Sequence, residues 1–362
     1  MGTKYISEAV ADAGFLPEKG KIVWESPSNI ALIKYWGKYG QQYPENPSLS
    51  MSLKKSVSIV ELRFRKNTDK KGTVDFKFEG IENQQFKQRV DKYLYQIAGY
   101  FPFLKDLHLE INSSNTFPHS SGVASSASFM SALALCICTL EKFTHQSYDS
   151  DFYQKASFMA RLGSGSASRS VLGKFAAWGK NSGFSGSSDE YAVSFTEFIP
   201  EYLRTIYDAV IIVNSAPKKV SSSQGHQLMQ NHFYKQARIQ QANTNIFRLM
   251  EAFSSNNWES ISDVIENEAL SLHALMLSSS PGYILLQQQT IDIIDAIREF
   301  RKESGAQICF TLDAGPNVHV LYTEKAKQQV ETFIDKELKP LAENNHIIYD
   351  KTGEGPVLKE KF

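Results

Sequence analysis

The sequence predicts an α+β protein with two lobes. The chain has 362 residues, more than one hydrophobic core usually organises, and 42% of them are apolar. Segments with strand alternation dominate the first half, and amphipathic helices with a hairpin follow, an order typical of α+β folds. Because Pro200 lies between two patterned segments, we expect an N-terminal lobe of residues 1–205 and a C-terminal lobe of residues 206–362.

The first half begins with a short extension over residues 1–20. Apolar alternation predicts strands within 21–25, 48–64, 73–78, 107–112 and 171–179. Apolar residues at helical spacing predict helices over 85–100, 129–143 and 149–162, the last of them capped by Asp149 or Ser150.

The second half contains most of the predicted helices. The apolar run AVIIVN predicts a buried strand over Ala209–Asn214. Amphipathic patterns then predict three helices, near 222–253, 258–277 and 284–303. Strands over 307–312 and 318–322 flank the turn DAGPN, and a helix over 324–343 and a short strand near 346–349 follow.

Composition argues against several classes of function. Lys+Arg and Asp+Glu number 39 each, which disfavours a nucleic-acid or anionic-membrane surface. Cys136, Cys138 and Cys309 lack zinc-binding spacing and indicate buried thiols in a reducing compartment. The longest apolar run, inside Phe129–Leu140, is too short to cross a bilayer, and the N-terminus lacks the pattern of a secretory signal. We therefore expect a cytoplasmic protein.

The stretch Asn115–Ala132, NTFPHSSGVASSASFMSA, joins a run of small residues to the start of an apolar helix. Pro118 stops the preceding strand, and the amides of the helix N-terminus favour an anion, most naturally the phosphates of a nucleotide. No Walker lysine is present, so serine hydroxyls and backbone amides would hold the phosphates and Mg²⁺. The same residues also fit an ordinary loop with a serine cap.

Two further stretches contain basic residues. Lys34 and Lys38 lie four residues apart in SNIALIKYWGK, which fits either a solvated face or a lysine held near a phosphate or carboxylate. In RLGSGSASRS, two glycines permit unusual backbone angles close to Arg169. That arginine can bind a diphosphate bidentately, and a flexible surface loop is the alternative.

One carboxylate stands out in the hairpin TLDAGPN. Asp313 ends a buried strand, where it is held rigidly enough to act as a general base; an Asx turn is the alternative. The histidines form no metal-binding pair, so we expect His226 and the others to be structural or to lie on the surface.

Together these stretches resemble the diphosphomevalonate decarboxylase family of the GHMP kinase superfamily. The matching segments span residues 26 to 322 and are SPSNIALIKYWGK, NTFPHSSGVASSAS, RLGSGSASRSVLGKFAAW, KKVSSSQGHQLM and TLDAGPNVHVLY. The resemblance implies a two-lobed GHMP kinase fold: a ribosomal-S5-like N-terminal lobe, a ferredoxin-like C-terminal lobe, and the active site in the cleft between them. It also implies a homodimer.

The implied activity is ATP-dependent decarboxylation of mevalonate 5-diphosphate to isopentenyl diphosphate, ADP, phosphate and CO₂, within the mevalonate route of isoprenoid biosynthesis. The tertiary 3-hydroxyl leaves poorly, so it is first phosphorylated. Loss of that phosphate leaves positive charge at C3, and the carboxylate then departs as CO₂. ATP and Mg²⁺ are the implied cofactors.

The resemblance also implies roles for single residues. Asp313 matches the catalytic aspartate at the 3-hydroxyl, Lys38 matches the lysine beside it, and Arg169 matches the partner of the substrate carboxylate. The implied substrate-binding residues are Tyr35, Lys38, Arg89 (on a looser alignment), Ser164, Ser166, Arg169, and Ser221 or Ser222. The implied ATP-binding residues are Ser120, Ser121, Gly122, Val123, Ala124, Ser125 and Ser126, with Ser125 and Ser126 also at Mg²⁺.

The sequence departs from the family pattern in a few places. The family usually reads FPTAAGLASSA where this chain reads FPHSSGVASSA, and Ser168 and Leu312 replace a cysteine and a phenylalanine. Three alternatives remain: a mevalonate 3-kinase that does not decarboxylate, a decarboxylase that acts on mevalonate 5-phosphate, and an inactive binding protein. Asp313 and Lys38 together favour decarboxylation.

Overall fold

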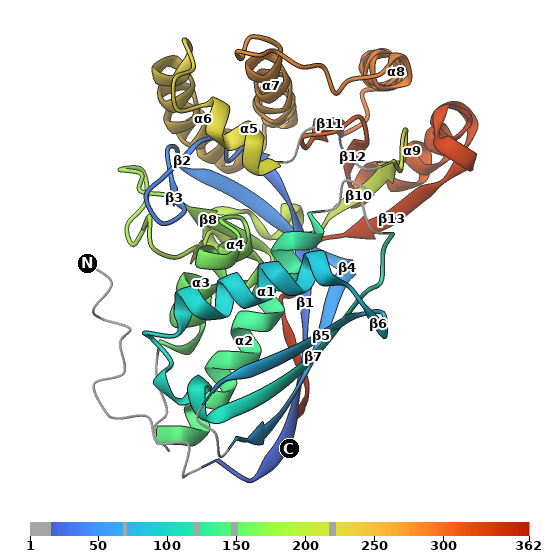
Figure 1. Cartoon of the computed structure of the whole chain (residues 1–362). Coiled ribbons are helices and arrows are strands. Elements are labelled where there is room, and N and C mark those ends of the chain that lie inside the picture. Colours follow the sequence, from blue (N-terminus) through green and yellow to red (C-terminus); the bar gives the residue numbers. More distant parts are fainter. Residues whose placement is uncertain (1–15, 68–70, 119–123, 146–150, 217–221, 362) are drawn as a thin grey trace.

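The computed structural model describes residues 16–67, 71–118, 124–145, 151–216 and 222–361. It confirms a mixed α+β architecture with two lobes (Figure 1). An eight-stranded sheet organises the lower lobe in Figure 1, and a four-stranded sheet organises the upper lobe. A short ribbon of β2 (Lys38–Tyr39) and β3 (Tyr43–Pro44) lies between them.

The large sheet has the strand order β14-β1-β4-β7-β5-β6, with β8 paired to β4 and β9 to β8. Its strands are β1 (Lys19–Ile33), β4 (Ser48–Lys66), β5 (Thr73–Phe78), β6 (Ile81–Glu82), β7 (Leu107–Asn115), β8 (Phe175–Trp178), β9 (Val193–Ser194) and β14 (Val357–Lys361). The predicted strand 21–25 is too short, because β1 continues past Pro27 to Ile33. A shift of register against β4 between Pro27 and Asn29 accommodates the proline, which has no N–H to donate.

Helices cover one face of this sheet. They are α1 (Gln84–Ile97), α2 (Ser125–His145), α3 (Phe152–Gly163) and α4 (Ala167–Ser170). The Ser125–Phe143 stretch of α2 is longer than the predicted apolar run and, by length and composition only, is long and apolar enough to cross a membrane. That stretch is 78% buried, because α2 packs on β1 and β4 as a core helix. α3 begins after Asp151, and the predicted caps Asp149 and Ser150 lie outside the described residues.

The upper lobe is built on an antiparallel sheet of order β11-β12-β10-β13. Its strands are β10 (Ile206–Ile211), β11 (Ile308–Leu312), β12 (Val318–Thr323) and β13 (Ile347–Lys351), and its helices are α5 (Ser222–Leu228), α6 (Lys235–Ser254), α7 (Trp258–Leu277), α8 (Gln288–Ser304) and α9 (Lys327–Phe333). α6, α7 and α8 stand side by side at the top of Figure 1.

Two of the predicted helices are interrupted. The helix predicted over 222–253 is divided into α5 and α6. The His232 ring accepts the Tyr234 amide between them, which fixes a turn there. The helix predicted over 324–343 changes after α9 into a π turn and then a short turn containing Pro340, whose ring cannot continue an α-helix.

β1 belongs to two hydrophobic cores. Ile22 and Trp24 pack in the core of the lower lobe with α2, whereas Ile30 and Ile33 pack in a second core with α6 and α7. The end of β1 therefore lies at the junction of the lobes. The predicted division at residues 205/206 falls directly before β10, and β14 returns the C-terminal end of the chain to β1.

Asp350 in β13 links the two sheets and gives a test of the junction. Its buried carboxylate accepts the main-chain amides of Lys54 (2.9 Å), Lys55 (2.8 Å) and Ser56 (2.7 Å) in β4. Asp350→Asn removes the charge and turns an amide N–H₂ toward these donors, so the free energy of unfolding should fall by about 2 kcal/mol. Urea unfolding measures the loss, and exposed Asp335→Asn, the control, should change it by less than about 0.5 kcal/mol.

Candidate active site

A cavity of about 1080 Å³ lies where the two lobes meet. The end of β1, the KYWGK segment, α1, the start of α2, the GSGS turn and the β11–β12 turn all contribute to its wall. Among the described lining residues there is a single carboxylate, Asp313, and there are five cations: Lys34, Lys38, Arg89, Lys92 and Arg169. This imbalance of charge suits a ligand with several negative charges.

The central contact of the cavity is the ion pair between Lys34 and Asp313. Lys34 Nζ lies 3.0 Å from Asp313 Oδ1; the lysine side chain is 2% exposed and the aspartate side chain 27%. Burial lowers the pKa of Lys34 from its ordinary value, and the nearby charge of Asp313 partly offsets this effect. Asp313 therefore keeps a cation beside it while part of its carboxylate still faces the cavity.

This pair corrects one predicted role. Lys38, which the family resemblance placed beside Asp313, donates instead to Gln42 Oε1 at 2.8 Å. The physical reason is the direction of the chain: β1 ends at Ile33 and points Lys34 into the junction, whereas Lys38 lies beyond the turn at Gly37, which has a φ of +93°. Lys38 still lines the cavity.

The turn that presents Asp313 is held from three sides. Asn317 Oδ1 accepts the amides of Val213 and Asn214, the Thr290 hydroxyl donates to Pro316 O, and His273 Nε2 lies 3.1 Å from the Asp313 carbonyl oxygen. These contacts fix the main chain on both sides of the carboxylate, as a positioned general base requires.

Arg169 lies on α4 and is 2% exposed, and its guanidinium group contacts neutral oxygens. It donates to Ser50 Oγ (2.9 Å), Ser48 Oγ (2.6 Å) and Asn29 Oδ1 (3.4 Å). Burial lowers the pKa of Arg169 to about 10, and Asp313 acts in the opposite direction. Because these three partners are uncharged, the positive charge is available to an anion in the cavity.

Tyr35 and the GSGS turn form one wall beside Arg169. The Tyr35 ring packs between Trp178 and His226, and its buried hydroxyl has no hydrogen-bond partner within the part of the chain that the structure describes. A Cβ at Gly165 would lie 2.8 Å from that hydroxyl, so only glycine fits. Ser164 and Ser166 also line the cavity, so the predicted substrate residues of this turn are brought together.

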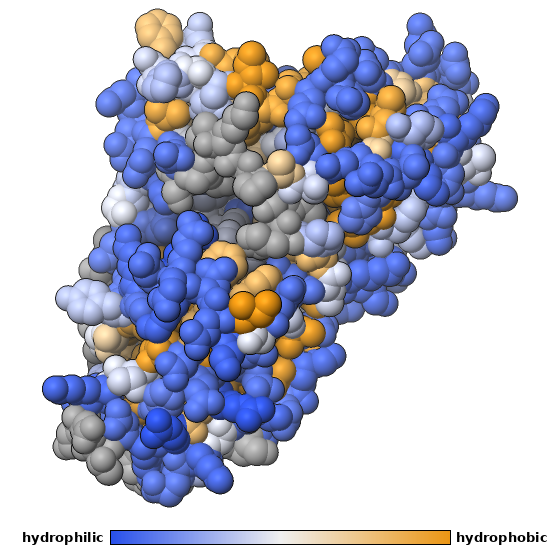
Figure 2. All heavy atoms as spheres, turned by 45° about the vertical axis from the view of Figure 1, so that its right-hand side comes forward, coloured by the Kyte–Doolittle hydropathy of each residue, from blue (hydrophilic) through white to orange (hydrophobic). Residues whose placement is uncertain are grey.

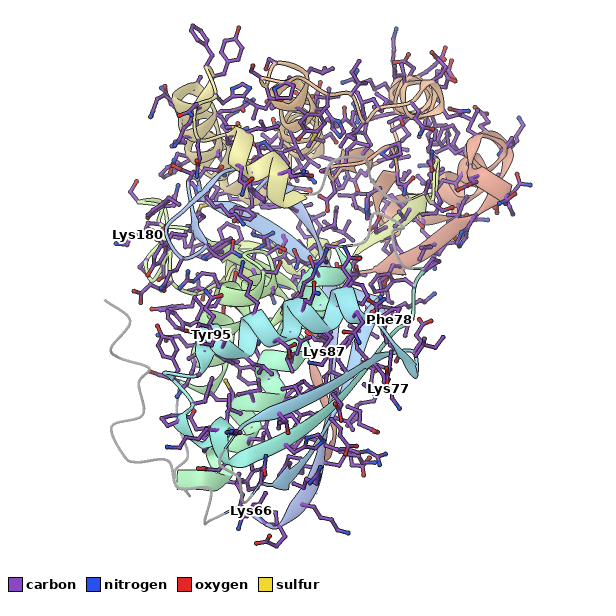
Figure 3. The ribbon with its side chains drawn as sticks, viewed as in Figure 1. Lys66, Lys77, Phe78, Lys87, Tyr95 and Lys180 are labelled. Carbon is purple, nitrogen blue, oxygen red and sulfur yellow. The ribbon has the colours of Figure 1, made fainter. Side chains whose placement is uncertain are left out.

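A second group of cations extends along α1. Arg89 and Lys92 line the cavity with Lys38, and both burial and the charge of Lys92 lower the pKa of Lys38. Figure 3 shows Phe78 and Tyr95, two residues of the cavity wall, at opposite ends of α1, so the cavity follows the helix.

The start of α2 opens onto the same cavity. Ala124, Ser125 and Ser126 line it close to the helix N-terminus, and Phe76 and Phe129 pack edge to face nearby. Small residues, free helical amides and aromatic rings suit a nucleotide. The predicted positions Ser120, Ser121, Gly122, Val123 and Ser221 lie outside the described residues, and Ser222 is described only as the first residue of α5.

His226 lies in the cavity wall and is buried, so of the two predicted roles, structural or on the surface, its contacts fit the structural one. Its ring packs on Tyr35 and Trp36, and its Nδ1 accepts the Gly37 amide at 3.0 Å. Burial, together with the charge of Lys38, lowers the pKa of His226 to about 3. The ring is therefore neutral and holds the KYWGK segment from the opposite lobe.

Sequence reasoning also missed the polar residues beneath Arg169. Ser48, Ser50 and Ser52 alternate in SLSMS and are all buried, so they share one face of β4. Serines at every second position of an otherwise apolar strand were the available signal of a buried polar partner.

The fold and the cavity together define a two-lobed enzyme of the GHMP kinase class with a site for anionic ligands at the lobe junction. Residues 26–192 match the model of the diphosphomevalonate decarboxylase-like N-terminal domain, and residues 209–361 match that of the mevalonate 5-diphosphate decarboxylase C-terminal domain. The chain belongs to the diphosphomevalonate decarboxylase family.

Individual relatives agree with this assignment. A diphosphomevalonate decarboxylase of Debaryomyces hansenii is 28% identical over 86% of this chain and 81% of its own length. A phosphomevalonate decarboxylase of Haloferax volcanii is 26% identical over 84% of this chain and 88% of its own length. The crystal structure of mevalonate diphosphate decarboxylase from Staphylococcus aureus is 30% identical, with a TM-score of 0.80 over 94% of this chain and 98% of that chain. A structure described as MDDEF in complex with MVAPP, AMPPCP and magnesium is 26% identical, with a TM-score of 0.79 over 94% and 99%.

The neutral state of His226 makes stability depend on pH. Between about pH 6.5 and about pH 3, His226 is protonated in the unfolded chain but stays neutral in the folded protein. The free energy of unfolding therefore falls as the pH falls through that window. At pH 5 the cost is about 2 kcal/mol. Urea unfolding at pH 7 and pH 5 should show a smaller acid loss in His226→Gln than in the wild type. His346→Gln, which changes an exposed histidine, should keep the wild-type loss; equal losses in all three proteins would contradict the assignment.

Proposed function

We propose that this protein catalyses the ATP-dependent decarboxylation of mevalonate 5-diphosphate to isopentenyl diphosphate, ADP, phosphate and CO₂. The observation that carries the proposal is the Lys34–Asp313 pair, which faces a cavity with four further cations. A carboxylate for the 3-hydroxyl, an arginine for the substrate carboxylate and cations for two phosphate-bearing ligands all lie within one space.

Asp313 is placed to orient the 3-hydroxyl and to accept its proton as the hydroxyl oxygen attacks the terminal phosphate of ATP. Lys34 keeps the aspartate ionised and counters charge on the transferring phosphoryl group. When the 3-phosphate leaves, positive charge develops at C3 and the C–C bond electrons form the alkene as CO₂ departs. Arg169 binds the carboxylate beforehand and so fixes the bond that breaks.

ATP and Mg²⁺ fit the start of α2. The described residues contain no group of three His, Cys, Asp or Glu side chains able to hold a metal ion. The serine hydroxyls of Ser125 and Ser126 would therefore hold Mg²⁺ together with phosphate oxygens, and Ala124 leaves room for the phosphates. Bound Mg²⁺ neutralises phosphate charge during transfer.

The number of cations supports a diphosphate substrate over a monophosphate. Lys38, Arg89 and Lys92 line the cavity in addition to the Lys34–Asp313 pair and Arg169. Three cations beyond those assigned to the reaction and to the carboxylate match a diphosphate better than a monophosphate. The phosphomevalonate decarboxylase among the relatives makes the monophosphate the alternative to be tested.

Two properties of the whole protein stay predictions. We propose a cytoplasmic location, which the free and buried thiols of Cys136, Cys138 and Cys309 support. We also propose a homodimer. Figure 2 shows apolar side chains gathered over the upper lobe, where Phe233 and Ile284 are 91% and 71% exposed. Light scattering at several protein concentrations tests the dimer.

The substrate is tested by incubating the protein with MgATP and, in turn, mevalonate, its 5-phosphate and its 5-diphosphate, and by measuring ADP and CO₂ separately. We expect equal amounts of both products with the diphosphate and little of either with the other two. ADP without CO₂ would identify a 3-kinase, and turnover of the monophosphate alone would overturn the choice of substrate. No turnover with any of the three would indicate an inactive binding protein.

Substitution of Lys34 and substitution of Lys38 should change different kinetic constants. Lys34→Met and Asp313→Asn should each lower kcat by about 10³-fold with ATP-analogue binding within about twofold, because they act on the reacting atoms. Lys38→Met should mainly raise KM for the diphosphate, by about tenfold, because it contacts the phosphates. Steady-state rates of ADP release measure kcat and KM for each variant. Lys180→Met, at an exposed lysine outside the cavity (Figure 3), should match the wild type; a greater loss of kcat in Lys38→Met than in Lys34→Met would reverse the assignment.

A further inference from the structure

The two members of the reacting pair come from different lobes. Lys34 follows β1 in the lower lobe, and Asp313 lies in the turn between β11 and β12 of the upper lobe. A lysine side chain has four rotatable bonds and no fixed direction of its own. Its ammonium group therefore meets Asp313 reproducibly only if the main chain at Lys34 is fixed relative to the upper lobe.

A buried ion pair of the upper lobe binds that main chain from both sides. Glu268 Oε2 on α7 accepts the Lys34 amide at 2.8 Å, and Arg238 Nη2 on α6 donates to the Lys34 carbonyl oxygen at 2.9 Å. The two side chains are joined by Arg238 Nη2–Glu268 Oε2 at 2.6 Å and Arg238 Nη1–Glu268 Oε1 at 2.8 Å. Arg238 is 3% exposed and Glu268 0%.

Neighbouring amides fix this ion pair in place. Asn245 donates to Glu268 Oε1 at 2.7 Å, and Gln241 accepts from Arg238 Nη1 at 2.8 Å. Asn46, from the lower lobe, donates to the Lys34 carbonyl oxygen at 2.9 Å. The contact between the lobes is thus a hydrogen-bonded network in which the Lys34 side chain takes no part and is left to bind Asp313.

Stability alone does not account for such a pair. Burying two charges costs free energy that their attraction often only repays, and apolar side chains of the same size would join two helices at least as well. A buried pair that binds both the N–H and the C=O of a reacting residue fixes the direction of its side chain, which apolar packing does not. It also completes an alternating row of charges: Arg238, Glu268, Lys34 and Asp313.

We propose that Arg238 and Glu268 are positioning residues: they hold the main chain at Lys34 so that its ammonium group meets Asp313 across the junction of the lobes. The proposal rests on the proposed function only in taking Lys34 and Asp313 as the reacting pair. Neither Arg238 nor Glu268 lines the cavity, so they act through Lys34 and not on the substrate.

The charge of Glu268 adds a second effect. Lys34 faces Asp313 and Glu268, whose charges raise its pKa, and Arg169, whose charge lowers it; Arg238 contacts its carbonyl oxygen. Burial is the largest influence and lowers this pKa. Removing the Glu268 charge lets Lys34 lose its proton at a lower pH, so the alkaline fall in kcat should begin at a lower pH.

The test compares two carboxylates of α7. Glu268→Gln keeps the shape and an acceptor oxygen but removes the charge. Glu266→Gln, the control, also neutralises a buried carboxylate that pairs with arginines, Arg298 and Arg301, but makes no contact with Lys34. Glu268→Gln should lower kcat about tenfold and leave KM for both substrates within about twofold of the wild-type values. The alkaline limb of its plot of kcat against pH should lie lower by about half a pH unit or more. In folded Glu266→Gln, kcat and the alkaline limb should both stay at the wild-type values.

Glu268→Asp and Arg238→Lys separate charge from geometry. Both keep the charge. Glu268→Asp withdraws the hydrogen bond to the Lys34 N–H, Arg238→Lys withdraws the one to the Lys34 carbonyl oxygen, and kcat should fall in each. The pH at which kcat falls on the alkaline side should stay closer to the wild-type value in Glu268→Asp than in Glu268→Gln. If Glu268→Gln does not fold, the kcat values of Glu268→Asp and Arg238→Lys, compared with that of Glu266→Gln, test the proposal. A wild-type kcat in both Glu268→Asp and Arg238→Lys would overturn it. An alkaline limb of Glu268→Gln at the same pH as that of Glu266→Gln would also overturn it.

A readout that needs no turnover keeps this test apart from the proposed reaction. In protein labelled with ¹³C at lysine Cε, the Lys34 resonance is the one missing from Lys34→Met. Its titration midpoint should be lower in Glu268→Gln than in Glu266→Gln even if no substrate is turned over. Equal midpoints would reject the role of Glu268, whereas shifted midpoints without turnover would reject only the proposed reaction.

Discussion

The ion pair between Lys34 and Asp313 is the contact on which the site depends. A lysine that is 2% exposed keeps its charge only where compensating groups surround it, and here the charges of Asp313 and Glu268 in the upper lobe compensate a lysine of the lower lobe. The lower lobe supplies Lys34 at the end of β1, and the upper lobe supplies Asp313 on a hairpin turn. The chemistry therefore requires the relative position of the lobes to be fixed at the atomic scale.

Several features of the fold meet this requirement. β1 crosses from one hydrophobic core into another, so its end packs against helices of the upper lobe. Asp350 binds three consecutive amides of β4, and β14 pairs with β1. The Asp350 contacts cross the junction, and they resist sliding better than apolar packing because a hydrogen bond has a narrow range of distance and angle.

The basic residues of the cavity around this pair differ in their surroundings. Arg169 rests on neutral oxygens, so its charge is available to an anion in the cavity. Lys38 in β2 and Arg89 and Lys92 in α1 also line the cavity, and the charge of Lys92 lowers the pKa of Lys38, so an anionic ligand between these two lysines would relieve their repulsion. His226 stays neutral between Tyr35 and Trp36, so it shapes the wall without adding to the positive charge. A cavity of this kind binds its ligands through charge and orients them through shape.

The sequence alone predicted the α+β class, the family and most strands and helices, because local periodicity and short motifs record these features. It also predicted a site containing Asp313, Arg169, Tyr35 and the GSGS turn, which the structure brings to one cavity. It did not determine which lysine of KYWGK meets Asp313, since two lysines four residues apart differ only in where β1 ends. It contained no sign of Arg238 or Glu268, and the alternating serines of SLSMS indicated a buried polar partner without identifying Arg169. Those partners are separated by 119 to 234 residues along the chain, so only tertiary structure, through the burial that makes such polar contacts obligatory, brings them together.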